Sequence, residues 1–263
     1  MTTSDDGKTV AIPKRALRGS RLRFLMLTSA PEEQIAETLT RLVSPLASVD
    51  PSHDRWMPIG FLHPKEARLG ECEKFLRPEI RSKLTQWWLK VPERANTPNW
   101  DLVSTCTVEG KQGIILVEGK AHAGELKRDG KPQGNAENDE QIELAIKEAT
   151  MGLEQIIPGW NLCRDSHYQL CNRFAWAWKI ATLGVPTILV YLGFLHATEM
   201  QDQGKPFDSP EEWNRTVLEH TSTGLANGAC VVPKLAWESQ IQTSGAPLWA
   251  VIRSLDQRWC VGG

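Results

Sequence analysis

Two short apolar runs joined by a tight polar connection constrain the fold of this chain more than any other feature. The runs include residues 99–103 and 114–120, and the connection at 109–112 reads Glu-Gly-Lys-Gln. Such a connection is typical of a turn, so we expect a β-hairpin whose two-residue loop is Gly110-Lys111. The second run contains four consecutive apolar residues, which favours a strand buried near the centre of a sheet.

Three ionisable residues, Asp101, Glu118 and Lys120, lie on this hairpin. Side chains alternate along a strand, so Glu118 and Lys120 share a face. With the loop at Gly110-Lys111, Asp101 lies opposite Lys120, and all three side chains project from one side of the sheet. Carboxylates are costly to bury unless they are paired, and Asp and Glu together invite a divalent cation. A metal ion beside a lysine is suited to hydrolysing a phosphodiester.

The tetrapeptide Val-Glu-Gly-Lys occurs twice, at residues 108–111 and 117–120, and the two copies differ in context. The first copy follows a polar stretch and falls where the chain must turn. The second copy follows the apolar run, as a central strand requires. We therefore assign the chemistry to the second copy alone.

The spacing of these residues resembles a known superfamily. Pro98-Asn99-Trp100-Asp101, followed by Glu118-Gly119-Lys120, looks like the signature of the PD-(D/E)XK nucleases. Segments 95–101, 117–122 and 166–176 also resemble bacterial proteins of that superfamily whose activity is uncharacterised. The resemblance spans about residues 60–195 and implies an α/β fold with a restriction-endonuclease-like mixed central sheet flanked by helices. It does not specify a substrate, because the superfamily includes restriction, repair and RNA-processing enzymes and some inactive members.

The resemblance also implies roles for individual residues. Asp101 and Glu118, helped by the Gly119 carbonyl, would hold Mg²⁺ or Mn²⁺, since hard cations take oxygen ligands. Lys120 would position or deprotonate the attacking water and stabilise charge on the phosphate. Gln169 resembles the helical glutamine that some superfamily nucleases place beside the metal site.

Four further residues are candidates for the same cleft. Superfamily members often supply an extra metal-ligand Glu from a helix before the hairpin, and Glu66 and Glu73 share a stripe of the helix that we expect over 64–76. His122 continues the face of the motif residues on the second strand, and Arg173 follows the candidate glutamine by one helical turn. The alternative for each is an ordinary structural role, as a solvated helix charge or a histidine at a strand end.

Two His-x-x-Glu pairs have the spacing of a helical metal pair. They are His122 with Glu125 and His196 with Glu199. Neither pair lies where we expect a helix, because the first follows a strand and the second precedes a polar loop. We regard both as weak metal candidates.

The remaining elements follow from periodicity, caps and breakers. We expect further strands over 21–28, 186–194 and 247–254, helices over about 29–43, 64–76, 78–90, 140–157, 165–183 and 210–220, and loops over 51–63 and 127–138. Ser29 is the candidate cap of the first helix. The superfamily core normally has another strand before the Asp-bearing one, and residues 91–98 are a poor candidate for it. Two alternatives stay open: the strand over 21–28 serves elsewhere in the sheet, or that core position is reduced.

Length and composition indicate one large α/β domain. The chain has 263 residues, of which 41% are hydrophobic and 24% charged, and no linker-like segment divides it. We expect a flexible basic arm over residues 1–20 and a single nuclease-like domain over 21–263, with its core at about 60–195. A local cationic cluster lies near the start and comprises Lys14, Arg15, Arg18, Arg21 and Arg23. It is either a solvated arm or a phosphate-binding arm.

The same composition favours a cytoplasmic location. Six scattered cysteines lack zinc-type spacing, and the polar, acidic first residues do not read as a secretory signal. The longest apolar stretch, 185–195, is too short to span a bilayer, so we expect no membrane partner. The net charge of −2 neither supports nor excludes a nucleic-acid partner, because an enzyme can confine positive potential to a groove.

These observations favour a Mg²⁺- or Mn²⁺-dependent nuclease that hydrolyses phosphodiester bonds. We expect nucleic acid as its partner, DNA in preference to RNA, and a chain able to form a homodimer. Two alternatives stay open. One is a catalytically inactive nuclease-fold module for nucleic-acid binding or assembly, and the other is a metal-dependent hydrolase of a small phosphorylated substrate.

Overall fold

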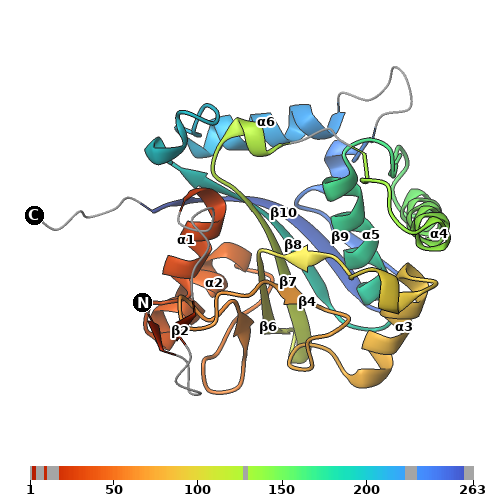
Figure 1. The fold of residues 1–263 in the computed structure, drawn as a ribbon, viewed down its shortest axis with the longest axis horizontal. Helices are drawn as coiled ribbons and strands as arrows, with labels where there is room; N and C mark the ends of the chain where they lie inside the picture. The colour runs from red at the N-terminus through yellow and green to blue at the C-terminus, as the bar shows by residue number, and fades with distance from the viewer. Residues whose placement is uncertain (1, 4–8, 11–17, 127–129, 223–229, 258–263) are drawn as a thin grey trace, which may run out of the picture.

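A six-stranded mixed sheet forms the centre of the computed structural model, which describes residues 2–3, 9–10, 18–126, 130–222 and 230–257. The strand order is β3-β6-β7-β8-β10-β9 (Figure 1). The strands are β3 (Trp56–Met57), β6 (Leu102–Val108), β7 (Lys111–Lys120), β8 (Thr187–Leu195), β9 (Gln240–Gln242) and β10 (Pro247–Asp256). Strands β7, β8 and β10 are parallel, and the other neighbours are antiparallel.

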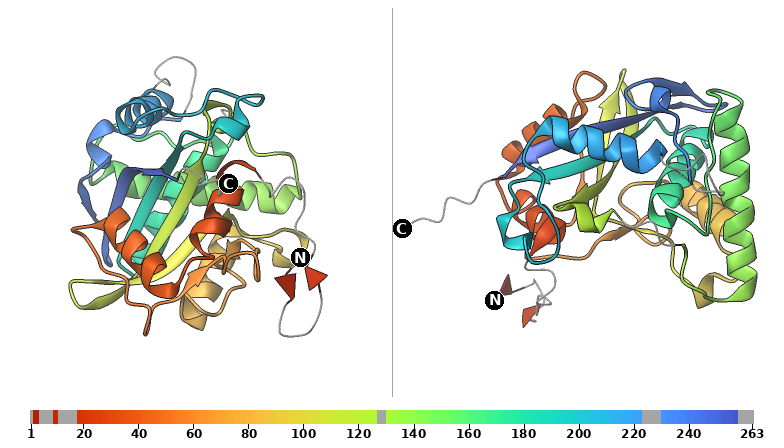
Figure 2. Two further views of the ribbon diagram at one scale, coloured as in Figure 1. Left: turned by 90° about the vertical axis from the view of Figure 1, so that its left-hand side faces the viewer. Right: turned by 90° about the horizontal axis from the view of Figure 1, so that it is seen from above.

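Helices cover both faces of this sheet (Figures 1 and 2). The first face packs on α1 (Gly19–Leu27) and α2 (Glu32–Val43). The second face packs on α3 (Pro78–Trp88), α4 (Ala136–Glu154), α5 (Tyr168–Thr182) and α6 (Pro210–Ser222). The predicted class, an α/β protein with a mixed sheet flanked by helices, is confirmed. None of the helices in the described part of the chain combines the length and the hydrophobicity needed to cross a membrane.

Short elements complete the description. Two additional antiparallel pairs are β1 (Thr2–Thr3) with β2 (Thr9–Val10) and β4 (Ala67–Arg68) with β5 (Asn99–Trp100). Short 3-10 helices are η2 (Pro92–Arg94), η3 (Ala123–Glu125), η4 (Thr198–Met200) and η5 (Lys234–Ala236).

Alternation along the central strands separates two hydrophobic cores. On β7, Ile115 and Val117 pack toward α1 and α2, whereas Ile114 and Leu116 pack toward α3, α4 and α5. Strand β8 is buried along its whole length because both of its faces are covered. The alternation continues to the end of β7, so Glu118 and Lys120 point to the α5 side.

The hairpin register differs from the prediction by two residues. Val108 pairs with Lys111, so the loop is Glu109-Gly110 rather than Gly110-Lys111. Both loop residues have positive φ, 48° and 76°, as a type I′ turn requires. The pairing of Leu102 with Val117 then brings Asp101 beside Glu118, and the predicted pairing with Lys120 is wrong. A shift of two residues preserves the face on which each side chain lies.

The predicted strand over 21–28 is wrong, because residues 21–27 belong to α1 and Thr28 caps its end. An apolar run this short fits a helix or a buried strand equally well, so tertiary contacts decide its form. Phe24 packs edge-to-face on Phe194, with ring centroids 4.9 Å apart, and the buried Arg23 pairs with Glu199. The following helix is confirmed, but it begins after Pro31, and Ser29 does not cap it.

The predicted helix over 64–76 is also wrong. Ala67 pairs with Trp100 and Arg68 with Asn99, so a short strand docks beside the start of the hairpin and turns follow it. Its apolar side chains are nevertheless buried as the pattern indicated, including Leu69 and Phe75. The other predicted helices and strands are present, with ends that move by a few residues.

The sequence did not reveal the two edge strands of the central sheet, β3 and β9. Strand β3 lies within the predicted loop over 51–63, and Trp56 pairs with Ser104 at the outer edge of β6. A strand of two residues leaves almost no alternation in the sequence, which explains why periodicity could not locate it. Of the predicted arm over 1–20, most lies outside the described residues, and Gly19 and Ser20 begin α1.

Gly119 faces α1, and this close approach explains the glycine in the motif. A Cβ at this position would lie 2.3 Å from Cε2 of Phe24, whose ring is held by Phe194. We expect Gly119→Ala to lower the free energy of unfolding by about 1–3 kcal/mol, measured by chemical denaturation. Gly134→Ala is the control, because its nearest neighbour is the flexible Nζ of Lys131, at 3.2 Å. Equal stability of both variants would show that the Phe24 ring yields freely.

Candidate active site

The predicted site residues meet in one pocket at the end of β7. The pocket has a volume of about 730 Å³ and lies between this strand end and the first turns of α5. Asp101, Glu118, Gly119, Lys120, Gln169 and Arg173 all line it. A second hollow of about 600 Å³ lies beside α6 and contains none of these residues.

Glu118 is the most buried charge in this pocket, with 0% of its surface exposed. Each of its oxygens accepts a hydrogen bond from a cation. Lys120 Nζ lies 2.6 Å from Oε1, and Arg173 Nε lies 2.6 Å from Oε2. Burial alone would raise the pKa of Glu118, but the charges of Arg173 and Lys120 outweigh burial and lower it. The carboxylate therefore stays ionised in the interior.

Asp101 lies beside Glu118, but its pKa is shifted in the opposite direction. Its Oδ2 accepts a hydrogen bond from the Gly119 amide at 2.8 Å. Burial and the negative charge of Glu118 raise the pKa of Asp101 to about 8, while Lys120 and the Gly119 amide oppose the rise. Without a metal ion the site therefore favours the protonated form of Asp101 at neutral pH, because burial and the neighbouring Glu118 carboxylate both disfavour the ionised form.

Gln169 lines the pocket from the first turn of α5. Its Oε1 accepts a hydrogen bond from Lys120 Nζ at 2.8 Å, so the predicted proximity to the motif lysine is observed. This bond orients the ammonium, which donates to Glu118 with a second N–H. No described residue accepts a hydrogen bond from the third N–H, which leaves it for a ligand in the pocket.

We expect Gln169→Ala to reduce turnover by about tenfold while lowering the melting temperature by only a few degrees. The loss follows because Lys120 would keep its charge but lose the bond that orients it. Steady-state hydrolysis and thermal unfolding of the same preparation measure the two effects. A melting temperature that falls steeply while turnover holds would assign Gln169 a structural role instead.

Arg173 follows Gln169 by one helical turn and shares its face of α5. Besides its bond to Glu118, it donates from Nη1 to Asn172 Oδ1 at 2.7 Å. Its guanidinium lies over the Trp100 ring, 4.6 Å from the centroid. The sequence analysis missed Trp100 as a site residue, although this residue stands inside the nuclease-like motif.

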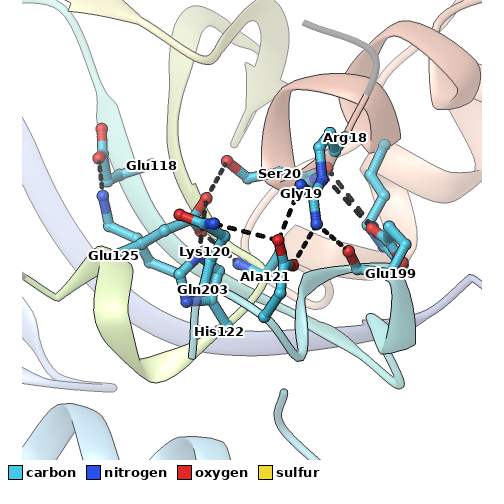
Figure 3. Close-up of polar contacts among 12 residues, drawn as sticks. Arg18, Gly19, Ser20, Glu118, Lys120, Ala121, His122, Glu125, Glu199 and Gln203 are labelled. Atoms are coloured by element: carbon cyan, nitrogen blue, oxygen red, sulfur yellow. Dashed lines mark hydrogen bonds and ion pairs between the residues drawn. The ribbon is translucent and has the colours of Figure 1, made fainter. Parts of the chain in front are cut away.

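Helix α1 forms another edge of the pocket, which the strand prediction had concealed. Ser20 and Glu125 both line the pocket, and Ser20 Oγ lies 3.4 Å from Glu125 Oε1. Figure 3 shows this contact near Lys120 and Glu118, with Glu199 holding the start of α1 from the other side. The site is therefore assembled from β7, η3, α5, α1 and the junction of β5 and β6 that carries Asp101.

The arginines near the start of the chain anchor α1. Arg18 pairs with Asp202, Arg21 with Glu66, and Arg23 with Glu199. These three side chains are thus engaged with acidic partners, which disfavours a phosphate-binding arm. Lys14 and Arg15, the rest of the predicted cationic cluster, lie outside the described residues.

The structure separates the two additional glutamates. Glu66 lies near Asp101 and contributes to raising its pKa, and it also accepts a hydrogen bond from Asn99 at 3.0 Å. Glu73 is exposed and pairs with Arg81 at 3.4 Å. The shared helical stripe that linked them is wrong, because residues 64–76 do not form a helix.

The two His-x-x-Glu pairs also differ. His122 Nε2 and Glu125 Oε1 lie 3.8 Å apart, and His122 packs against Gly124 and Gly204 rather than lining the pocket. His196 contacts Asp256 at 3.2 Å, whereas Glu199 pairs with Arg23. Of the two pairs, only the first is brought together.

The donor set of the pocket fits a hard cation with few protein ligands. Within the described residues, no group of three or more His, Cys, Asp or Glu side chains is arranged to hold a metal ion. Asp101, Glu118 and the Gly119 carbonyl would supply oxygen ligands only. Mg²⁺ keeps several waters and commonly takes one or two carboxylates, so this set suits Mg²⁺ or Mn²⁺ better than zinc.

Comparison with known proteins adds no relative. No protein-family model, no curated protein and no solved structure matches this chain.

Proposed function

We propose that this protein is a Mg²⁺- or Mn²⁺-dependent nuclease of the PD-(D/E)XK type, hydrolysing phosphodiester bonds in DNA. The observation that carries the proposal is the convergence of Asp101, Glu118, Lys120 and Gln169 in one pocket. These residues come from positions 101 to 169, and the resemblance to the nucleases had already grouped them from the sequence alone. The order of helix, hairpin, helices and parallel strand agrees with the core that the resemblance implies.

The residues of the pocket divide the chemistry between them. Asp101 and Glu118 would hold the cation, which, when bound, makes water more acidic and neutralises charge on the phosphate. Lys120 would use its remaining N–H to orient the attacking water or to stabilise the developing phosphate charge. Gln169 keeps the Lys120 ammonium in place, and the buried walls limit competing water.

Two observations support alternative functions. The fully buried Glu118 lies deep in the pocket, which favours a small phosphorylated substrate over a broad duplex. The bonds from Lys120 and Arg173 also satisfy both oxygens of Glu118 without a metal ion, as an inactive binding module would require.

One assay distinguishes the three functions. End-labelled single- and double-stranded DNA and RNA are incubated with Mn²⁺, Mg²⁺ or EDTA, beside a small diester such as bis(4-nitrophenyl) phosphate. Metal-dependent shortening of DNA is the expected result. Hydrolysis of the small ester alone favours a hydrolase of a small phosphorylated substrate. Nucleic-acid binding without any turnover favours an inactive binding module and overturns the proposal.

A further inference from the structure

The negative charge of Glu118 is already balanced by two positively charged side chains, before any metal ion binds. Its two oxygens accept bonds from Lys120 and Arg173, each at 2.6 Å, and both donors are positively charged. A divalent ion placed on this carboxylate would approach two cations at close range. One of the two must withdraw before the carboxylate can serve as a strong metal ligand.

Arg173 is better placed than Lys120 to withdraw. Lys120 is held by Gln169 as well as by Glu118, and it lies only two residues from Glu118 on the same strand. The charged group of Arg173 lies over the Trp100 ring, and this cation–π contact depends on the position of the charge over the ring rather than on the direction of its N–H groups. Its head group can therefore turn over the ring without losing that contact.

Arg173 also has donors left for a ligand. A guanidinium carries five N–H groups, and the described contacts use Nε toward Glu118 and Nη1 toward Asn172. Nη2 has no hydrogen-bond partner among the residues that the structure describes, and the side chain lines the pocket. A planar fork of this kind matches the oxygens of a phosphate group.

We propose that Arg173 exchanges partners, binding Glu118 in the empty pocket and a substrate phosphate oxygen when Glu118 takes the cation. The inference rests on the proposed function, and it makes Arg173 a phosphate-binding residue of the same site. Cation and phosphate then bind cooperatively, because the phosphate draws Arg173 away from the carboxylate that the cation needs. By linkage, each ligand increases the affinity for the other by the same factor.

Mn²⁺ titration measures this coupling directly. Free Mn²⁺ is followed by electron paramagnetic resonance, with and without dimethyl phosphate, at constant ionic strength set with NaCl. In the wild type we expect dimethyl phosphate to lower the Mn²⁺ dissociation constant by about tenfold or more. In Arg173→Met we expect tighter Mn²⁺ binding than in the wild type without phosphate, and no further gain with it.

Two variants serve as controls. Lys179→Met removes a cation from α5 six residues beyond Arg173, where the side chain pairs with Glu148, and should behave as the wild type. Arg173→Lys keeps the charge but lacks the fork, and should retain only part of the coupling. Coupling that survives intact in Arg173→Met would overturn the inference, as would its absence from the wild type.

A measurement on the wild type covers the case in which Arg173→Met does not fold. For this NMR measurement diamagnetic Mg²⁺ replaces Mn²⁺. The Nε–H resonance of Arg173 should shift only when Mg²⁺ and dimethyl phosphate are both present. An unchanged resonance would contradict the exchange. If DNA is cleaved but neither coupling nor shift is seen, the inference alone fails. If no divalent cation binds at all, the proposed function fails with it.

Discussion

Replacing Lys120 by Ala is expected to reduce metal-dependent hydrolysis by about 100- to 1,000-fold. The ammonium is held by Glu118 and Gln169 at 2.6 and 2.8 Å, and it is the group placed to orient water or to stabilise charge on the phosphate. Groups in such roles contribute on the order of 10²- to 10³-fold. Arg173 remains to balance the buried Glu118, so the folded state should survive. Initial rates on DNA, measured beside the melting temperature, test this expectation.

The chain provides its own matched control for this substitution. Lys111 ends the first copy of Val-Glu-Gly-Lys, in which Glu109 and Gly110 form the exposed hairpin loop. Lys111→Ala removes the same side chain from the same tetrapeptide and should leave hydrolysis unchanged. Mn²⁺ binding should persist in Lys120→Ala, because a cation that competes for Glu118 has been removed. Equal activity of the Lys120 and Lys111 variants would eliminate Lys120 from the chemistry.

Asp101→Asn is expected to stabilise the protein without metal and to abolish its stabilisation by Mn²⁺. Burial raises the pKa of Asp101 to about 8, above its ordinary value of 3.8. The folded state therefore holds this proton while the unfolded state releases it. The stability that this proton contributes is complete below about pH 4 and is lost as the pH rises toward 8. The advantage of Asp101→Asn over the wild type should grow across that same interval.

The size of the effect follows from the exposure of the carboxyl group. One pKa unit corresponds to about 1.4 kcal/mol, but Asp101 is only partly buried, and water at the pocket mouth weakens the penalty. We expect Asp101→Asn to raise the free energy of unfolding by about 1–3 kcal/mol at pH 8 and by much less at pH 4. Urea denaturation at several pH values measures this difference. Asp165→Asn, at an exposed carboxyl, is the control and should change stability by less than about 0.5 kcal/mol.

Metal binding should show the opposite pH dependence. A cation needs the ionised carboxylate, so its binding must release the proton from Asp101 below pH 8. The apparent Mn²⁺ affinity of the wild type should rise by up to about tenfold per pH unit between pH 6 and 8 and then level off. Thermal melts with and without Mn²⁺ at each pH provide the measurement. A metal-dependent shift that persists in Asp101→Asn would remove Asp101 from the ligand set.

Local patterns in the sequence determined the central hairpin and the face of its charged residues. Alternation has a period of two, and the turn differed from its predicted position by one residue, which moved the register by two. Glu118 and Lys120 therefore stayed on the predicted face, although Asp101 lies beside Glu118 rather than Lys120. The long amphipathic helices were equally readable, because their apolar positions repeat over several turns. Gln169 was predicted to lie near Lys120 because the resemblance implied a glutamine on that helix beside the hairpin, and the two side chains are hydrogen-bonded.

Tertiary structure decided the elements whose local signal was short. Residues 21–27 became helical because Phe24 packs on Phe194 and Arg23 on Glu199, more than 160 residues away. Residues 64–76 did not form a helix because β4 pairs with β5 at the start of the hairpin and turns follow it. The bond from Arg173 to Glu118 and its stacking on Trp100 likewise join distant segments. Periodicity reports which side of an element is buried, but partners separated by long stretches of chain are chosen by packing and charge pairing in three dimensions.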